Sequence, residues 1–202
     1  VNWERPVYFS VTCSEDSFIG MKDFLRLEGL AFRVTPVSYS FGDYVSYSAL
    51  IENLMYPAKK AVAKPERGFL FREYSPGYFR HGDAVNGMQS NYRNAFMQLA
   101  RYQLSILKSP AEAIASLSRM NKEVDPEVFP LDYRYAFDIG VLYKEAGAES
   151  RYNEMMEQVE RDCRKAIEWN PYKVQSIYSP YRYLFELYQS QGRIKEARAV
   201  LD

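Results

Sequence analysis

The sequence is poor in the residues that build metal sites and disulfide scaffolds. It contains a single histidine, His81, and two cysteines in 202 residues. These counts exclude a multi-histidine zinc site and a structural zinc knuckle, and any Ser-His-Asp or Cys-His arrangement would have to run through His81. We therefore predict no metal and no cofactor. The sequence leaves open whether Cys13 and Cys163 pair in an oxidising compartment.

An excess of one charge and long apolar runs are also lacking. Lys and Arg number 26, Asp and Glu number 26, and neither the first 90 residues nor the remainder is unbalanced. Because nucleic-acid-binding proteins carry a basic footprint, we expect no nucleic-acid partner. No apolar run approaches the ~18 residues of a membrane span, and no signal-peptide pattern follows the first residue, Val1. We interpret the chain as a piece of a longer protein.

Aromatic residues, in contrast, are abundant, with 18 Tyr, 12 Phe and 2 Trp making up 16% of the chain. Hydrophobic residues make up 47%, and a chain of this length buries a sizeable core without disulfides. Wholesale disorder is therefore excluded.

Residues 1–45 predict a small α/β unit. Residues 7–12, a β-branched and aromatic run, favour a strand, and residues 31–35 favour a second strand closed by Pro36. Between them, residues 18–27 carry apolar side chains mostly at the three- and four-residue spacing of a short amphipathic helix. Strand, helix and strand form a βαβ unit, whose crossover is right-handed. Because two strands alone are marginal, we expect this remnant to join further strands preceding Val1 or to lean on the helices that follow.

Residues 46–90 predict one helix, at 48–55, followed by a long connector that mixes basic and aromatic residues. One interpretation is a surface loop held down by its aromatic side chains. The other is a basic-aromatic surface for an anionic partner such as a lipid headgroup, since loops of this length are often functional. The residues concerned are Lys59, Lys60, Lys64, Arg67, Phe69, Phe71, Arg72, Tyr74, Tyr78, Phe79 and Arg80.

Residues 91–202 predict an antiparallel array of helices, which makes the chain mostly α. In residues 181–201 the spacing of Leu184, Tyr188, Gly192 and Ala197 is that of a tetratricopeptide repeat, in which two helices pack closely about a glycine turn. Units at 97–126 and 136–171 fit more loosely, and the second of them needs a second helix about two turns longer than usual. The sequence thus predicts about three degenerate tetratricopeptide-like units, with a coincidental array of helical hairpins as the alternative.

The first helices of such repeats line a concave face. In the predicted register this face carries mixed charge with aromatic side chains, which suits a polypeptide groove and equally suits an ordinary solvated helix surface. The candidate groove residues are Gln98, Tyr102, Arg134, Phe137, Lys144, Arg182, Glu186 and Gln189.

Patterns that would indicate catalysis are weak. Glu154, Glu157 and Glu160 lie three residues apart, but a di-iron pattern needs Glu-x-x-His, so we interpret them as a solvated acidic stripe. There is no glycine-rich phosphate loop and no nucleophile elbow. No activated Ser or Cys stands beside His81 in sequence. We predict a chain that is not a catalytic domain, and a free-standing hydrolase built around His81 is a remote alternative.

Three N-terminal motifs and one helix start carry a resemblance to a known family. The motifs lie at residues 2–12, 18–20 and 27–36, and the helix start is the Asn-Tyr-Arg-Asn sequence at 91–94. In these four segments the chain resembles a family of large multi-spanning membrane proteins that is common in Bacteroidetes and was formerly of unknown function. Members of that family are similar to protein O-mannosyltransferases. The resemblance covers nearly all of the chain, departs most at 56–85, and is generic in the repeats.

This resemblance implies a soluble C-terminal region, ending in tetratricopeptide-like repeats, behind a membrane-spanning glycosyltransferase body. The family's presumed catalytic acid lies between early membrane spans, so no catalytic residue is carried over to this chain. We expect a non-catalytic module at the periplasmic face of the inner membrane that binds or positions a polypeptide, such as the acceptor protein. The alternative is a structural cap that packs on its own membrane domain and binds no ligand.

Overall fold

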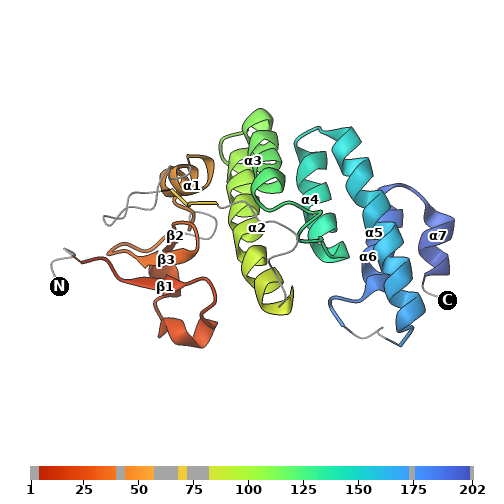
Figure 1. Ribbon diagram of the computed structural model, residues 1–202, viewed down its shortest axis with the longest axis horizontal. Coiled ribbons are helices and arrows are strands. Elements are labelled where there is room, and N and C mark those ends of the chain that lie inside the picture. The colour runs from red at the N-terminus through yellow and green to blue at the C-terminus, as the bar shows by residue number, and fades with distance from the viewer. Residues whose placement is uncertain (1–4, 40–43, 57–67, 72–81, 173–175, 201–202) are drawn as a thin grey trace. The chain divides into compact units, whose positions relative to one another are not determined.

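A computed structural model describes residues 5–39, 44–56, 68–71, 82–172 and 176–200 of the chain (Figure 1). The chain is mostly α-helical with a small sheet near its N-terminus, as the sequence predicts. It divides into two compact units, Val1–Phe129 and Pro130–Asp202. The expected organisation into 1–45, 46–90 and 91–202 stays a prediction.

The N-terminal sheet is antiparallel, so the predicted βαβ unit is wrong. Strands β1 (Tyr8–Ser10), β2 (Leu25–Leu27) and β3 (Ala31–Val34) lie in the order β1-β3-β2, with both pairings antiparallel. The segment predicted as one helix contains two short 3-10 helices, Glu15–Phe18 and Lys22–Phe24, and then β2. Ile19 and Gly20 adopt positive φ angles of 49° and 74°, which interrupt a continuous helix. The strand that joins the two predicted ones is therefore β2, which lies between them in the sequence.

The first unit is built outward from this sheet. Phe18, Leu25 and Val34 form a buried cluster. The chain at 44–46 then runs beside β2, because the amide of Leu27 donates to the carbonyl of Tyr44 at 2.6 Å and the amide of Ser46 donates to the carbonyl of Leu27 at 2.9 Å. The helix predicted at 48–55 is present as α1 (Tyr47–Leu50), which continues into a π-helical turn, Ile51–Met55.

Two long helices complete this unit. Helix α2 (Gly82–Ser105) packs against α3 (Pro110–Glu123), and α1 contacts α2. The turn predicted at 108–110 is confirmed, with Lys108 at a φ of 52°. Inside the pair, the hydroxyl of Ser116 donates to the side chain of Gln103 at 2.8 Å. The buried guanidinium of Arg93 donates to the carbonyls of Val124 and Phe129, which ties the end of the unit to α2.

The second unit consists of consecutive helical hairpins. Its helices are α4 (Tyr133–Glu145), α5 (Glu149–Trp169), α6 (Pro180–Ser190) and α7 (Ile194–Ala199). Each contacts the next. The three-residue connections from α4 to α5 and from α6 to α7 make these neighbours antiparallel. Helices α5 and α6 are antiparallel as well, since Tyr152 near the start of α5 contacts Ser190 at the end of α6. The predicted turn glycines Gly147 and Gly192 have φ angles of 75° and 70°, and the predicted long second helix is α5.

The close helix approaches expected of this unit are present. A Cβ added at Gly140 on α4 would lie 3.1 Å from the Cβ of Met155 on α5. Leu184, Tyr188 and Ala197 are all buried, as predicted. Within the described part of residues 91–202 there is no strand. The helical hairpins are therefore confirmed, whereas their assignment to tetratricopeptide repeats stays a prediction.

Candidate functional site

The eight candidate groove residues are divided between the two units. In the first unit, Gln98 and Tyr102 on α2 both engage the chain's own N-terminal part. The hydroxyl of Tyr44 donates to Oε1 of Gln98 at 2.8 Å. The ring of Tyr102 stacks on Tyr47, with centroids 5.4 Å apart and planes inclined by 17°. This face of α2 is thus partly covered by residues 44–47.

In the second unit, α4 and α6 lie side by side and run in the same direction. Near their first turns, the ring of Tyr133 meets that of Tyr183 edge-on, with centroids 5.4 Å apart. At their last turns, Nζ of Lys144 donates to the carbonyl of Ser190 at 3.5 Å. Because starts meet starts and ends meet ends, these two helices are parallel neighbours separated in sequence by α5.

The surface made by these two helices, which we call the α4/α6 face, carries an aromatic cluster. The ring of Phe137 also meets Tyr183 edge-on at 5.4 Å, and all three rings are half-buried. Arg134 and Arg182 flank the cluster from α4 and α6. Phe137 is predictable from the sequence, whereas its partners Tyr133 and Tyr183 are not among the predicted groove residues. Tyr133 could have been found from the sequence, because it is four residues before Phe137 on the same helix. Tyr183 could not, because it meets Phe137 only through the contact of α6 with α4. The members of the face are Tyr133, Arg134, Phe137, Arg182, Tyr183 and Glu186.

The charged members of this face have partners within the unit. Asp132 accepts from the amides of Arg134 and Tyr135 at 2.9 and 3.2 Å and caps α4. Burial opposes its ionisation, but hydrogen bonds from the Arg134 side chain and these amides outweigh burial and lower the pKa of Asp132. The Arg134 guanidinium also lies 5.2 Å from the centre of the Tyr178 ring. Arg182 pairs with Glu186 at 2.7 Å.

The two remaining candidates lie at the other end of α4 and α6. Lys144 is exposed, and its ammonium lies 4.8 Å from the centre of the Tyr152 ring. Gln189 is exposed on α6. The structure therefore brings Arg134 and Phe137 together with Arg182 and Glu186. Lys144 lies about two turns beyond Phe137 on α4, and Gln189 lies about one turn beyond Glu186 on α6.

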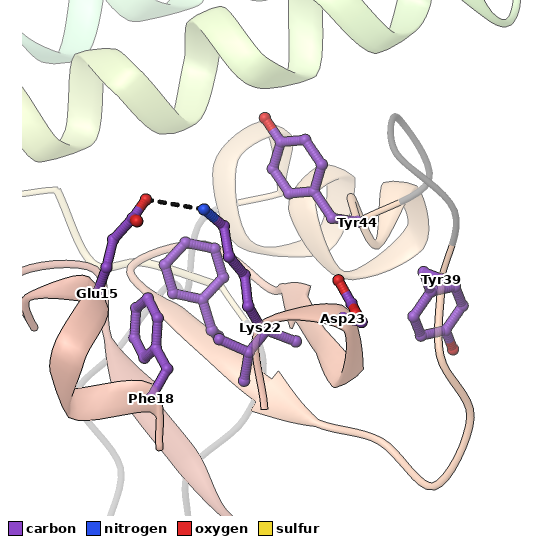
Figure 2. A pocket seen from close by; sticks show the side chains of 8 residues that line it. Glu15, Phe18, Lys22, Asp23, Tyr39 and Tyr44 are labelled. Atoms are coloured by element: carbon purple, nitrogen blue, oxygen red, sulfur yellow. Dashed lines mark hydrogen bonds and ion pairs between the residues drawn. The ribbon is translucent and has the colours of Figure 1, made fainter. Parts of the chain in front are cut away.

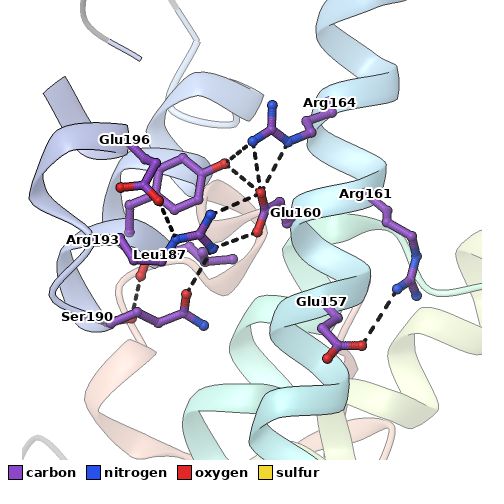
Figure 3. Close-up of polar contacts among 10 residues, drawn as sticks. Glu157, Glu160, Arg161, Arg164, Leu187, Ser190, Arg193 and Glu196 are labelled. Carbon is purple, nitrogen blue, oxygen red and sulfur yellow. Dashed lines mark hydrogen bonds and ion pairs between the residues drawn. The ribbon is translucent and has the colours of Figure 1, made fainter. Parts of the chain in front are cut away.

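The acidic stripe on α5 contains a structural joint that sequence reasoning missed (Figure 3). The carboxylate of Glu160 accepts from Arg193 at 2.8 Å, from Arg164 at 2.9 Å and from the hydroxyl of Tyr188 at 2.9 Å. The Arg193 hydrogen bond is the largest cause that lowers the pKa of Glu160 to about 2; burial opposes it, and Arg164 and Tyr188 add to it. The side chain of Glu160 is only 24% exposed. The interpretation of Glu160 as a solvated group is therefore wrong. Its carboxylate links α5 to Tyr188 on α6 and to Arg193 in the turn before α7.

The other two acidic residues of the stripe are ordinary surface partners. Glu154 pairs with Arg151 at 3.0 Å, and Glu157 lies 4.0 Å from Arg161.

Across the described ranges, no group of three or more His, Cys, Asp or Glu side chains is placed to hold a metal ion.

A pocket of about 410 Å³ lies in the first unit beside the N-terminal sheet (Figure 2). Phe18, Leu25 and Phe32 contribute its apolar lining. Lys22 and Glu15 form an ion pair at 2.9 Å on one side. The remaining lining residues are Asp23, Tyr39 and Tyr44. The pocket suits a small apolar group.

A second pocket, of about 320 Å³, shares Phe32 and Tyr44 with the first. It is lined on its far side by the amide-bearing residues Asn91, Asn94 and Gln98 of α2. Neither pocket was found from the sequence, because their walls combine residues from segments far apart in the chain.

Of the predicted connector, the structure describes residues 68–71. Phe69 and Phe71 each meet the ring of Tyr92 on α2 at 5.5 Å, which holds this piece of the connector against the helix. His81 and the connector residues Lys59, Lys60, Lys64, Arg67, Arg72, Tyr74, Tyr78, Phe79 and Arg80 lie outside the described residues.

Both cysteines are free thiols. Cys163 is fully buried, and burial raises the pKa of its thiol to about 12. A thiol that stays protonated at neutral pH is a poor nucleophile, so Cys163 is a packing residue.

Comparison with known proteins gives one match. A family model described as TMEM260-associated domain 2 matches residues 1–49. The matched segment contains the whole sheet and every residue that lines the larger pocket. No curated protein and no solved structure matches the chain. Within the described residues, no helix has both the length and the apolar character that crossing a bilayer requires.

Proposed function

We propose that the chain is a non-catalytic module of a glycosyltransferase-like integral membrane protein, which binds a polypeptide on the α4/α6 face. The polypeptide is the acceptor protein, held beside the membrane active site at the periplasmic side of the inner membrane. The match of residues 1–49 to a TMEM260-associated domain supports this parentage, because such proteins resemble protein O-mannosyltransferases. The N-terminal motifs of the sequence point to the same kind of parent.

The observation that carries the proposal is the parallel adjacency of α4 and α6. These are the first helices of two successive hairpins, and contacts at both ends hold them side by side. In tetratricopeptide arrays, successive first helices line the surface that binds extended polypeptides. The geometry of the second unit therefore favours the tetratricopeptide-like interpretation over a coincidental set of hairpins.

The chemistry of the α4/α6 face suits a polypeptide. Binding energy at such surfaces is concentrated in a few aromatic and arginine side chains. Phe137 and Tyr183 are half-buried, so each retains ring surface for a partner, and Arg134 and Arg182 stand on either side. The carboxylate of Glu186 adds hydrogen-bond acceptors to the donors that Arg134 and Arg182 provide.

A structural cap is the second candidate function, and one observation favours it. Arg134, Lys144 and Arg182 already contact acceptors or rings within the unit. A face whose cations are satisfied internally does not require a ligand. In that case the second unit packs on the membrane body and recognises nothing else.

The test is capture of short Ser/Thr-rich peptides on an array by the purified chain. We expect the double variant Phe137→Ala/Arg182→Ala, which keeps the Tyr133–Tyr183 contact between α4 and α6, to lose most of its capture while its circular dichroism spectrum is unchanged. Tyr56→Ala, which removes an exposed tyrosine of the first unit, is the matched control and retains capture. If the double variant is folded and captures peptides as well as the unaltered chain, the structural cap is correct.

A further inference from the structure

Helix α2 carries a polar stripe on the side that faces the N-terminal sheet. Asn91, Asn94 and Gln98 lie three and four residues apart, which places them on one face of the helix. All three line the pocket of about 320 Å³, and Leu27 and Phe32 of the sheet line it as well. A helix that packs on a sheet ordinarily turns apolar side chains toward it. Here a polar cavity lies between them, which we call the amide pocket after its three amide side chains.

Hydrogen bonds within the first unit hold one wall of the amide pocket in place. The hydroxyl of Tyr44 donates to Oε1 of Gln98 at 2.8 Å, and Figure 2 shows this hydroxyl directed toward α2. The bond engages the acceptor oxygen of Gln98 and leaves its amide nitrogen to donate. The backbone of Tyr44 is also fixed, because its carbonyl accepts from the amide of Leu27 at 2.6 Å. A ligand therefore meets a wall that needs little further ordering.

The lining of the amide pocket favours a neutral ligand that is rich in hydroxyl groups. Among the described residues that line it, none carries a charge. An ion entering the pocket would thus lose hydration without gaining a counter-charge. A hydroxyl group both donates and accepts hydrogen bonds, and so does the amide of an Asn or Gln side chain. Phe32 and Tyr44 add aromatic surface, which suits the apolar C–H face of a sugar ring.

The size of the amide pocket favours a small molecule. Its volume of about 320 Å³ lies at the lower end of the range of small-molecule sites. This volume suits a single sugar ring better than an extended polypeptide. The sheet and α2 together enclose this space within the first unit.

The larger pocket indicates what the sugar carries. The two pockets share Phe32 and Tyr44, so they adjoin at these two side chains. Beyond that border, Phe18 and Leu25 give the larger pocket an apolar wall. A substituent of the sugar that crosses the border therefore gains most if it is apolar.

We propose that the amide pocket binds the sugar ring of a neutral glycoside, whose apolar aglycone enters the larger pocket. The amides of Asn91, Asn94 and Gln98 bond to the sugar hydroxyl groups, and Phe32 and Tyr44 contact its C–H face. The site lies in the first unit and depends neither on the α4/α6 face nor on the proposed function.

The experiment is a titration followed by nuclear magnetic resonance of the isotope-labelled chain. The probes are the methyl and 4-nitrophenyl pyranosides of glucose, galactose and mannose. At least one sugar is expected to shift the side-chain amide resonances of Asn91, Asn94 and Gln98 saturably. Its 4-nitrophenyl form is expected to bind roughly tenfold more tightly than its methyl form, because the ring enters the apolar pocket. Glucose 6-phosphate and glucosamine, which are charged, are expected to bind much more weakly than the neutral sugar.

Two variants test the amides, and circular dichroism checks that each is folded. Asn91→Leu leaves the bond between Tyr44 and Gln98 intact and is expected to weaken binding roughly fivefold, the effect of one lost hydrogen bond. Gln98→Leu removes both an amide and the acceptor of Tyr44, so the loss is expected to be larger. Gln189→Leu, which replaces an exposed amide on α6, is the matched control and leaves the affinity unchanged.

Three results would overturn the inference. One is the absence of a saturable shift with all of the pyranosides. Another is affinity that survives both Asn91→Leu and Gln98→Leu in folded protein. The third is tighter binding of N-acetylglycinamide than of any sugar, which assigns the pocket to a polypeptide backbone. Sugar binding that persists in Phe137→Ala/Arg182→Ala is expected, and it separates this site from the peptide capture of the proposed function.

Discussion

Neutralising Glu160 is expected to weaken the joint between α5, α6 and the turn before α7. The carboxylate accepts from Arg193, Arg164 and Tyr188 at 2.8 to 2.9 Å. A pKa of about 2, against 4.5 for an ordinary glutamate, sets a ceiling of ~3 kcal/mol on its stabilisation of the folded state. Because Arg164 is more than half exposed, solvent screening reduces this. We expect Glu160→Gln to cost ~1–2 kcal/mol at pH 7.

The pH dependence follows from the direction of the pKa change. The folded pKa of Glu160 lies below its unfolded value, so its stabilisation is complete above about pH 4.5 and is lost as the pH falls through about 2. Urea unfolding followed by circular dichroism measures the difference between the unaltered chain and Glu160→Gln at each pH. That difference is expected to shrink across this window.

Glu157→Gln is the matched control on the same helix. Glu157 is exposed and lies 4.0 Å from Arg161, so its neutralisation is expected to cost less than ~0.5 kcal/mol. Equal losses for the two variants, or a Glu160→Gln loss that is the same at pH 7 and pH 3, would refute the reasoning.

Three further outcomes are expected from the packing. Ala197→Leu overpacks a buried contact and costs ~1–3 kcal/mol in thermal melts, whereas Arg198→Leu at the exposed neighbouring position costs much less; equal shifts would mean that the helix register is wrong. Gly140→Leu pushes α4 away from α5 and destabilises by at least ~1–3 kcal/mol in urea, and an unchanged midpoint would contradict the close approach. Iodoacetamide is expected to modify Cys13 in the folded chain and Cys163 only after unfolding, as mass spectrometry can establish.

The helices of the second unit were predictable because their signals are local. Gly147 and Gly192 end their helices with positive φ angles, and apolar side chains between them follow the helical period. The N-terminal sheet was not predictable in the same way. Leu25 and Leu27 were interpreted as part of a helix, yet both are buried on one face of β2 because β3 pairs with it. Pairing with a neighbouring strand overrode a weak local pattern.

The candidate sites show the same limit. Phe137 and Arg182 were found because their helix register is readable, but the Tyr183 contact that joins them depends on α4 and α6 lying side by side. Glu160 was assigned to a solvated stripe because its partner Arg193 is 33 positions later in the chain. A spacing analysis detects partners within a helix, such as Arg164, and misses partners brought close by folding.

The most direct test of the proposed function is site-specific photo-crosslinking from position 137 in the full-length membrane protein to which we propose that this chain belongs. A benzophenone side chain placed there lies on the α4/α6 face, beside Tyr183. If this face holds the acceptor, irradiation of cells is expected to yield adducts with glycosylated polypeptides, and the same probe at position 56 yields none. Adducts confined to the parent protein's own membrane domain would contradict the proposal and assign the second unit to a structural cap.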